Sequence, residues 1–116
     1  METKELTIGD KLMAKLLSQI PNTYILHTWT ANDYSRDLQV KPIPLTSEIL
    51  EKNGWEHSGI FMEKRVDENS FFSWSDRYGS VLYRNSYHMC DCKYAHTLQH
   101  ALRLCGLNSL ADNFKV

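Results

Sequence analysis

Apolar residues first recur at helical spacing, between residues 8 and 20 of the chain. Thr7, with Asp10 three residues later, resembles a pair that caps a helix N-terminus. Pro21 closes the segment, because proline cannot continue a helical hydrogen-bond ladder. The apolar positions on one face are Leu12, Met13, Leu16, Leu17 and Ile20. The spacing predicts a helix over residues 8–20.

The residues that follow favour an extended backbone. Residues 23–30 are rich in β-branched and aromatic side chains and predict a strand. The polar residues 31–37 predict a loop. Residues 38–43 predict a short strand, which Pro42 and Pro44 confine to a sheet edge because proline has no N–H to donate.

A short helix is predicted over residues 46–53. Thr46 is the expected N-cap, and Glu48 suits the positive end of the helix dipole. Gly54 is placed to end the helix in the left-handed conformation. Apolar side chains at Leu45, Ile49 and Leu50 would dock the helix on a sheet.

After Trp55 the apolar period becomes two, which is typical of strands with one buried face. Turn residues at 67–69 and at 76–79 separate the segments. The predicted strands cover residues 60–66, 71–75, 80–84 and 87–90. Short strands at this spacing favour an antiparallel meander.

A final helix is predicted over residues 93–105, with Gly106 as its C-cap and with Leu107 and Leu110 packing back on the body. Its apolar stripe is Tyr94, Ala95, Leu98, Ala101, Leu102 and Cys105. The expected fold is α+β: an antiparallel sheet of three to five strands packed with two or three helices. The last helix is expected to be the main contributor to the core, within a single domain over residues 1–116.

The charge of the chain bears on whether its partner is a nucleic acid. The formal net charge is −1, and neither a basic footprint for nucleic acid nor a long acidic run is present. Three cysteines, no apolar leader and no apolar stretch of membrane-spanning length predict a cytoplasmic protein with reduced thiols and no membrane contact.

The cluster His88-x-Cys90-x-Cys92-x-x-x-His96-x-x-x-His100 is the strongest chemical signal in the chain. Thiolates and imidazoles suit Zn²⁺, but the C-x-C spacing is not that of a zinc knuckle. The competing interpretation is a packing helix with two histidines beside small buried thiols. Cys92 with a neighbouring histidine supplies the residue types for nucleophilic catalysis without a recognisable motif. We expect no metal, no cofactor and no catalytic residue.

A second signal is a concentration of aromatic and arginine side chains, the types that dominate protein interface hot spots and that stack on unpaired bases. Strand alternation makes about half of them core residues. The whole set is Phe71, Phe72, Trp74, Arg77, Tyr78, Tyr83, Arg84 and Tyr87, with Tyr34 and Arg36 in the predicted loop. The predicted partner-binding residues are Tyr34, Arg36, Trp74, Arg77, Tyr78 and Arg84.

Residues 41–55 (KPIPLTSEILEKNGW) and 93–104 (KYAHTLQHALRL) resemble the "PIPLT-E-IL-K-GF" and "KYVHQLQ–L" signatures of small phage, prophage and mobile-element proteins of Bacteroidetes-type bacteria. Residues 4–10 resemble that family's "ELRIGN" start. In the family this start leads into a β-barrel-like segment, from which the helix predicted over residues 8–20 departs. The family keeps a histidine at the position of His96 within a core helix and lacks the paired cysteines, which favours the packing interpretation.

The resemblance implies a mobile-element setting and no known activity. By analogy with other small phage proteins, we expect a non-enzymatic accessory protein that binds a host protein or ribonucleoprotein complex. Its concrete form is an anti-CRISPR inhibitor that occludes an RNA-guided nuclease, with an RNA contact left open. The alternative is a small zinc- or RNA-binding module that uses the C-terminal Cys/His cluster.

Overall fold

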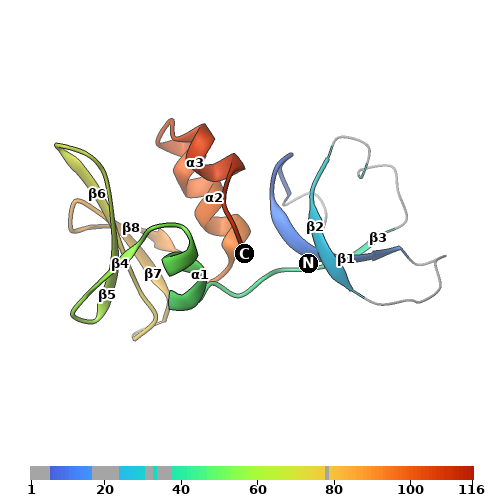
Figure 1. Cartoon of the computed structure of the whole chain (residues 1–116), viewed down its shortest axis with the longest axis horizontal. Helices are drawn as coiled ribbons and strands as arrows, with labels where there is room; N and C mark the ends of the chain where they lie inside the picture. The colour runs from blue at the N-terminus through green and yellow to red at the C-terminus, as the bar shows by residue number, and fades with distance from the viewer. Residues whose placement is uncertain (1–5, 17–23, 31–32, 34–37, 78) are drawn as a thin grey trace.

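The computed structural model describes residues 6–16, 24–30, 33, 38–77 and 79–116. A three-stranded sheet and a five-stranded sheet lie at opposite ends of an elongated molecule, with helices between them (Figure 1). The strands are β1 (Lys11–Leu16), β2 (Ile25–Thr28), β3 (Leu38–Lys41), β4 (Glu56–Ser58), β5 (Phe61–Asp67), β6 (Ser70–Ser75), β7 (Val81–Arg84) and β8 (Tyr87–Asp91). The helices are α1 (Ser47–Lys52), α2 (Ala95–Leu104) and α3 (Asn108–Asp112). The architecture confirms the predicted α+β class.

The helix predicted over residues 8–20 is wrong: residues 11–16 form β1, the central strand of the sheet β2-β1-β3. Residues 17–20 lie outside the described residues. Both neighbours pair with β1 in antiparallel register. The departure from the family pattern was inferred from this helix, and the strand removes that reason for it.

The segment satisfies two periods, and tertiary pairing selects one of them. Leu12 and Ala14 alternate toward a small core with Leu6, Trp29 and Val40. A short isolated helix is only marginally stable in water, whereas β1 gains hydrogen-bonded partners on both edges. The Thr7–Asp10 pair forms as predicted, but as a turn: Asp10 accepts from the Thr7 amide at 2.8 Å ahead of a strand.

The connection from β3 to α1 follows the sequence closely. β3 lies at an edge of its sheet, as the prolines after it require. The Thr46 hydroxyl caps α1 by accepting from the Ile49 amide, and Gly54 adopts φ +82° beyond the helix. A bridge between Pro44 and Tyr94 holds this connection against the start of α2, which is why α2 begins at residue 95 rather than 93.

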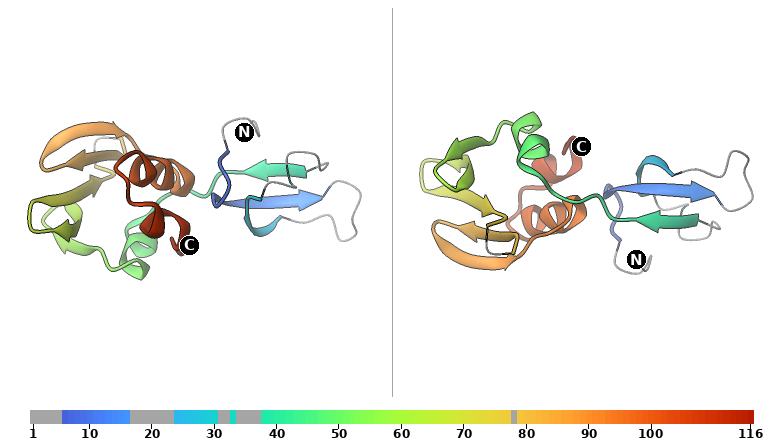
Figure 2. Two further views of the ribbon diagram at one scale, coloured as in Figure 1. Left: turned by 90° about the horizontal axis from the view of Figure 1, so that it is seen from above. Right: turned by 90° about the horizontal axis from the view of Figure 1, so that it is seen from below.

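The five-stranded sheet is an antiparallel meander in the order β4-β5-β6-β7-β8. Four of its strands were predicted, whereas the short edge strand β4, whose three residues are all exposed, was not. The sheet curves around α2 and α3, which both lie on its concave side (Figure 2). The predicted turns at residues 67–69 and 76–79 connect the strands, although Tyr78 itself lies outside the described residues.

The main core lies between this sheet and α2. Phe72, Trp74 and Leu82 from the strands meet Leu98 and Leu102 of α2. This confirms the prediction that the last long helix is central to the core. Helix α3 was not predicted: Leu107 packs at the core margin as expected, whereas Leu110 remains 37 % exposed.

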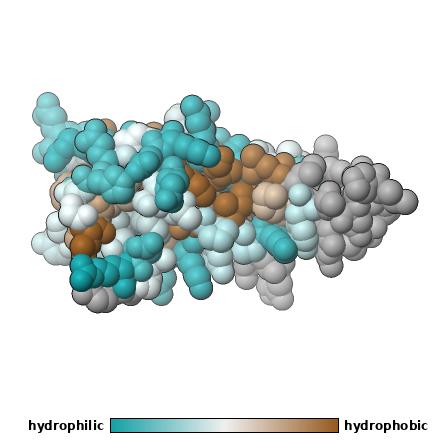
Figure 3. All heavy atoms as spheres, turned by 60° about the horizontal axis from the view of Figure 1, so that its bottom comes forward, coloured by the Kyte–Doolittle hydropathy of each residue, from teal (hydrophilic) through white to brown (hydrophobic). Residues whose placement is uncertain are grey.

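Polar contacts rather than a shared core join the two halves. The buried Gln99 side chain of α2 accepts from the Lys11 amide at 2.8 Å and donates to the Gly9 carbonyl at 2.9 Å. The two hydrophobic clusters have no residue in common. Figure 3 shows apolar side chains gathered near the middle of one face, beside a more hydrophilic end.

Candidate functional site

The C-terminal Cys/His cluster is divided by the fold. Cys92 and Cys90 belong to the main core and its margin. His96 stacks on Tyr94 with ring centroids 5.9 Å apart, and His100 turns toward the three-stranded sheet. Among the residues that the structure describes, no three His, Cys, Asp or Glu side chains are grouped so that they could hold a metal ion.

Burial also makes Cys92 a poor nucleophile. The side chain is fully buried, and burial followed by the nearby Cys90 raises the pKa of its thiol well above the ordinary value. The pKa of Cys90 is raised for the same leading reason. Since the thiolate is the reactive form, the catalytic interpretation of Cys92 loses its chemical basis.

His100 instead belongs to a cluster around the buried carboxylate of Asp10, the Asp10 cluster (Asp10, His100, Arg103). Asp10 accepts from His100 Nε2 and from Arg103 Nη1, both at 2.6 Å. Burial by itself raises the pKa of Asp10, but these two hydrogen bonds and the Thr7 amide outweigh it and leave the pKa below its usual range. The cluster ties the turn before β1 to α2, and its role in the fold is structural.

The predicted partner-binding set is dispersed. Tyr34, Arg36 and Tyr78 lie outside the described residues. The prediction that Trp74 binds a partner is wrong. Its side chain is only 1 % exposed and its indole N–H donates to the Cys92 carbonyl at 2.7 Å, so Trp74 is a core residue.

The two remaining residues are exposed but stand apart. Arg77 lies in the turn between β6 and β7. Arg84 belongs to the helix side, where its guanidinium is 5.9 Å from the Phe72 ring centre and contacts Cys105 Sγ at 3.4 Å.

Other aromatic residues converge on the convex face of the five-stranded sheet. Phe61 of β5 meets Tyr83 of β7 edge-on, with ring centroids 5.7 Å apart, and Tyr83 meets His88 of β8 at 6.0 Å. We call Phe61, Tyr83 and His88 the outer aromatic row. Because β6 lies between β5 and β7, the rings meet above its small residues Ser73 and Ser75, which are buried although they lie on the outer side.

The side chains beside this row carry charge. Arg65 faces its cross-strand partner Phe71, with the guanidinium 5.6 Å from the ring centre. Glu56 and Glu63 lie directly opposite each other on β4 and β5. Like charges in such a pair repel each other, whereas Lys64 and Arg65 line the same edge of the sheet, so the edge carries both signs of charge.

These residues border a polar depression of about 400 Å³ at the β4–β5 edge. The helices pack on the opposite side of the sheet and leave this face uncovered (Figure 2). The convex face therefore offers aromatic contact area together with an edge of mixed charge, in which Glu56 and Glu63 form an anionic pair.

Sequence reasoning named Phe71 and Tyr83 as members of an aromatic set but missed Phe61 and His88 as their neighbours. The alternation of β6 carried a usable signal: once Phe72 and Trp74 face the core, residues 71, 73 and 75 must face outward. Which strands flank β6 depends on sheet order, which a local pattern does not give.

Comparison of the chain with protein-family models, with curated proteins and with solved structures finds no match. None of the helices in the described residues has the length and apolar character that a membrane-spanning helix needs.

Proposed function

We propose that this chain is a phage or mobile-element accessory protein that binds and inhibits a host defence complex. In this proposal the convex face of the five-stranded sheet is the contact surface. Inhibition is by occlusion, as an anti-CRISPR protein would block an RNA-guided nuclease. The mobile-element setting rests on the sequence resemblance, and the binding role rests on the outer aromatic row.

One observation carries the binding role: a sheet face with three interlocked rings that no element of the described chain covers. The half-buried rings of Phe61 and Tyr83, which are held edge to face, lose little conformational freedom when a partner covers them. Aromatic side chains of this kind are the ones on which interface binding energy concentrates.

The Glu56–Glu63 pair at the β4–β5 edge favours a protein partner that presents basic groups there. A nuclease must present such a surface to its nucleic acid, because phosphate neutralisation supplies much of the affinity. The pair Glu56 and Glu63 would face the basic groups while the aromatic row supplies apolar burial. Occupation of the basic surface would then exclude the nucleic acid.

Unpaired RNA is the second candidate, favoured by the pairing of Arg65 with Phe71. A guanidinium and an aromatic ring can both stack on bases. The neighbouring glutamates repel phosphate, which is why the protein partner is placed first. An RNA-binding surface would show steep loss of affinity with added salt and would not require a protein target.

The test starts with affinity capture from a host lysate, identification of the retained complex by mass spectrometry, and an activity assay of that complex after purification. We expect stoichiometric inhibition that Tyr83→Ala weakens at least about tenfold, as is usual for a central aromatic contact. Glu56→Lys, an exposed change that leaves the core intact, should weaken it as well, because it replaces a negative charge that faces the basic groups of the partner.

Tyr87→Ala is the matched control, because Tyr87 is a 79 % exposed aromatic residue on β8 outside the row. It should inhibit like the unmodified chain. Equal inhibition by all variants would remove the convex face from the proposal. Retention of no defence complex by the unmodified chain would remove the inhibitor function itself.

A further inference from the structure

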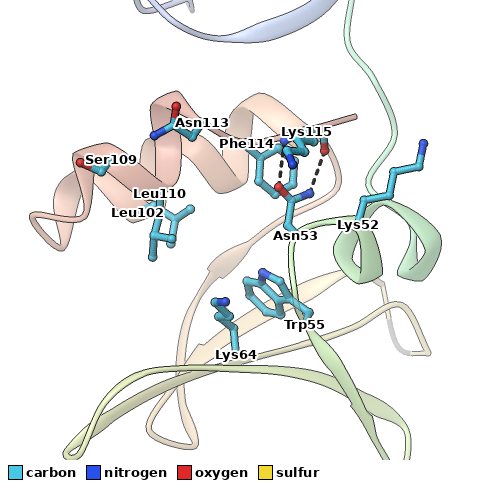
Figure 4. A pocket seen from close by; sticks show the side chains of 10 residues that line it. All are labelled: Lys52, Asn53, Trp55, Lys64, Leu102, Ser109, Leu110, Asn113, Phe114 and Lys115. Atoms are coloured by element: carbon cyan, nitrogen blue, oxygen red, sulfur yellow. Dashed lines mark hydrogen bonds between the residues drawn. The ribbon is translucent and has the colours of Figure 1, made fainter.

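A second surface, on the opposite side of the five-stranded sheet, contains a pocket of about 320 Å³. Figure 4 shows it between α1 and β5 on one side and α3 with the segment 113–116 on the other. Its apolar walls are Trp55, Leu102 and Phe114, with Leu110 at the rim. The size suits one or two large side chains and lies at the low end for small-molecule sites.

Two hydrogen bonds fasten the segment that closes this pocket. Asn53 Nδ2 donates to the Lys115 carbonyl at 2.7 Å, and the Lys115 amide donates to Asn53 Oδ1 at 2.8 Å (Figure 4). The amide side chain thus pairs with the segment as a neighbouring strand would. Because this fastening is built from main-chain groups of Lys115, the lysine side chain remains available at the rim.

The charge of the pocket is one-sided. Lys52, Lys64 and Lys115 contribute to its lining, and no acidic residue does. Within the described residues none of the three forms an ion pair. Lys64 rises from β5 beside Trp55, whereas Lys52 stands at the outer edge (Figure 4). The chain as a whole has a net charge of −1, so this group of lysines is a local positive region. Beside an apolar pocket, it favours a ligand that carries both a negative charge and an apolar group.

A second depression, of about 410 Å³, has Asn113, Phe114 and Lys115 in its lining as well. It also reaches Lys11 and Leu26 of the three-stranded sheet, and the acidic Asp112 lines it, so the one-sided positive charge is confined to the first pocket. Leu26 is 55 % exposed, and its strand β2 is an edge strand. An extended path with apolar positions at both ends fits a chain-shaped occupant better than a compact molecule.

We propose that the two depressions form one groove for an acidic peptide segment of a partner protein, which inserts an apolar side chain against Trp55, Leu102 and Phe114. Carboxylates beside that side chain pair with Lys64 and Lys115. The apolar contact supplies affinity and the lysines select for negative charge. This site lies on the other side of the sheet from the outer aromatic row and does not depend on the proposed function, although Lys64 also lines the depression at the β4–β5 edge.

The test uses a short labelled synthetic peptide with one phenylalanine between two pairs of glutamates. Binding is followed by fluorescence anisotropy and by the NMR signal of the Trp55 indole N–H, which the buried Trp29 and Trp74 serve to reference. We expect saturable binding with a shift at Trp55. The double variant Lys64→Gln/Lys115→Gln should weaken the affinity at least about tenfold, since two charge contacts are lost.

Lys93→Gln is the matched control, because Lys93 is exposed and lies outside the groove. It should bind like the unmodified chain, and a peptide with alanine in place of phenylalanine should bind at least about tenfold more weakly because it cannot fill the pocket. Two results would overturn the proposal: no movement of the Trp55 signal at millimolar peptide, or equal weakening by Lys93→Gln, which would show general attraction of acidic peptides.

Discussion

The carboxylate of Asp10 is where the turn before β1 and helix α2 meet. It is fully buried, yet it accepts from His100, Arg103 and the Thr7 amide. Removing its charge leaves the mostly buried guanidinium of Arg103, which is 16 % exposed, with only the weaker contact to Asp112, and this costs free energy of unfolding. Glycine is required at position 9 for the same contact. Its φ is +96°, and an added Cβ would lie 2.9 Å from the Arg103 side chain.

Asp10→Asn should lower the free energy of unfolding by about 3 kcal/mol at neutral pH, because the charged acceptor of two donors is lost. The pKa of Asp10 is lowered in the fold, so its contribution is fully present above the unfolded value of 3.8. That contribution is lost as the pH falls through the folded pKa. The gap between variant and unmodified chain should therefore narrow below pH 3.8.

Urea unfolding at a series of pH values measures this gap. Asp112→Asn is the control, because Asp112 is 58 % exposed and meets Arg103 only at 3.3 Å. Its effect should stay below about 1 kcal/mol. If both substitutions have the same small effect, the Asp10 cluster is not a stabilising contact.

At the scale of elements, the sequence predicted the ends of helices and the turns correctly, because there a single residue sets the conformation or the hydrogen bond of the backbone. The cap at Thr46, the glycines after α1 and α2, and the turns of the meander all follow from such residues. The helix prediction for residues 11–16 was wrong because the apolar residues there fit both a helical and a strand period. β4 was missed because three exposed residues carry no apolar alternation.

Thr46→Ala should lower the free energy of unfolding by about 1 kcal/mol, because the Ile49 amide loses its acceptor. Thr46→Ser keeps the hydroxyl and should restore nearly all of it. Thermal unfolding followed by circular dichroism compares the variants. If serine is as destabilising as alanine, the effect of Thr46 comes from its methyl group rather than from the cap.

At the scale of the whole molecule, the two halves form an elongated body. The radius of gyration is 15.0 Å, whereas a compact chain of this length is expected at about 13.4 Å. Among the described residues, the core of the three-stranded sheet contains Leu6, Leu12, Ala14, Trp29 and Val40. Gln99 and the Asp10 cluster tie this sheet to α2, so we expect its order to depend on them.

Gln99→Leu should selectively loosen the three-stranded sheet. The substitution nearly preserves volume but removes the side-chain partner of the Lys11 amide and of the Gly9 carbonyl. It also removes one of the donors to the Ala111 carbonyl, which still accepts from the Phe114 amide. Hydrogen exchange by NMR should show protection of the β1 and β2 amides reduced at least about tenfold, since each lost buried bond costs about 1 kcal/mol or more. Amides of β5 to β7 should keep theirs.

Leu104→Ala, at an 85 % exposed position of α2, should leave both sheets protected. A uniform loss of protection across both sheets in Gln99→Leu would show that the chain unfolds as one cooperative unit and that Gln99 is not a joint between two parts.

The sequence alone determined the meander, the caps, the last helix as core element and the α+β class, because these depend on near neighbours and on the alternation of apolar residues. Tertiary structure alone decided that residues 11–16 extend, since their hydrogen-bond partners lie on distant segments. It also decided that Cys90 and Cys92 belong to the main core and its margin, whereas His100 contacts Asp10. In the same way it decided that Trp74 is buried and that Phe61 and Tyr83 meet on the outer face. Those outcomes depend on strand order and on which residues pair across the chain, and a local pattern does not contain that information.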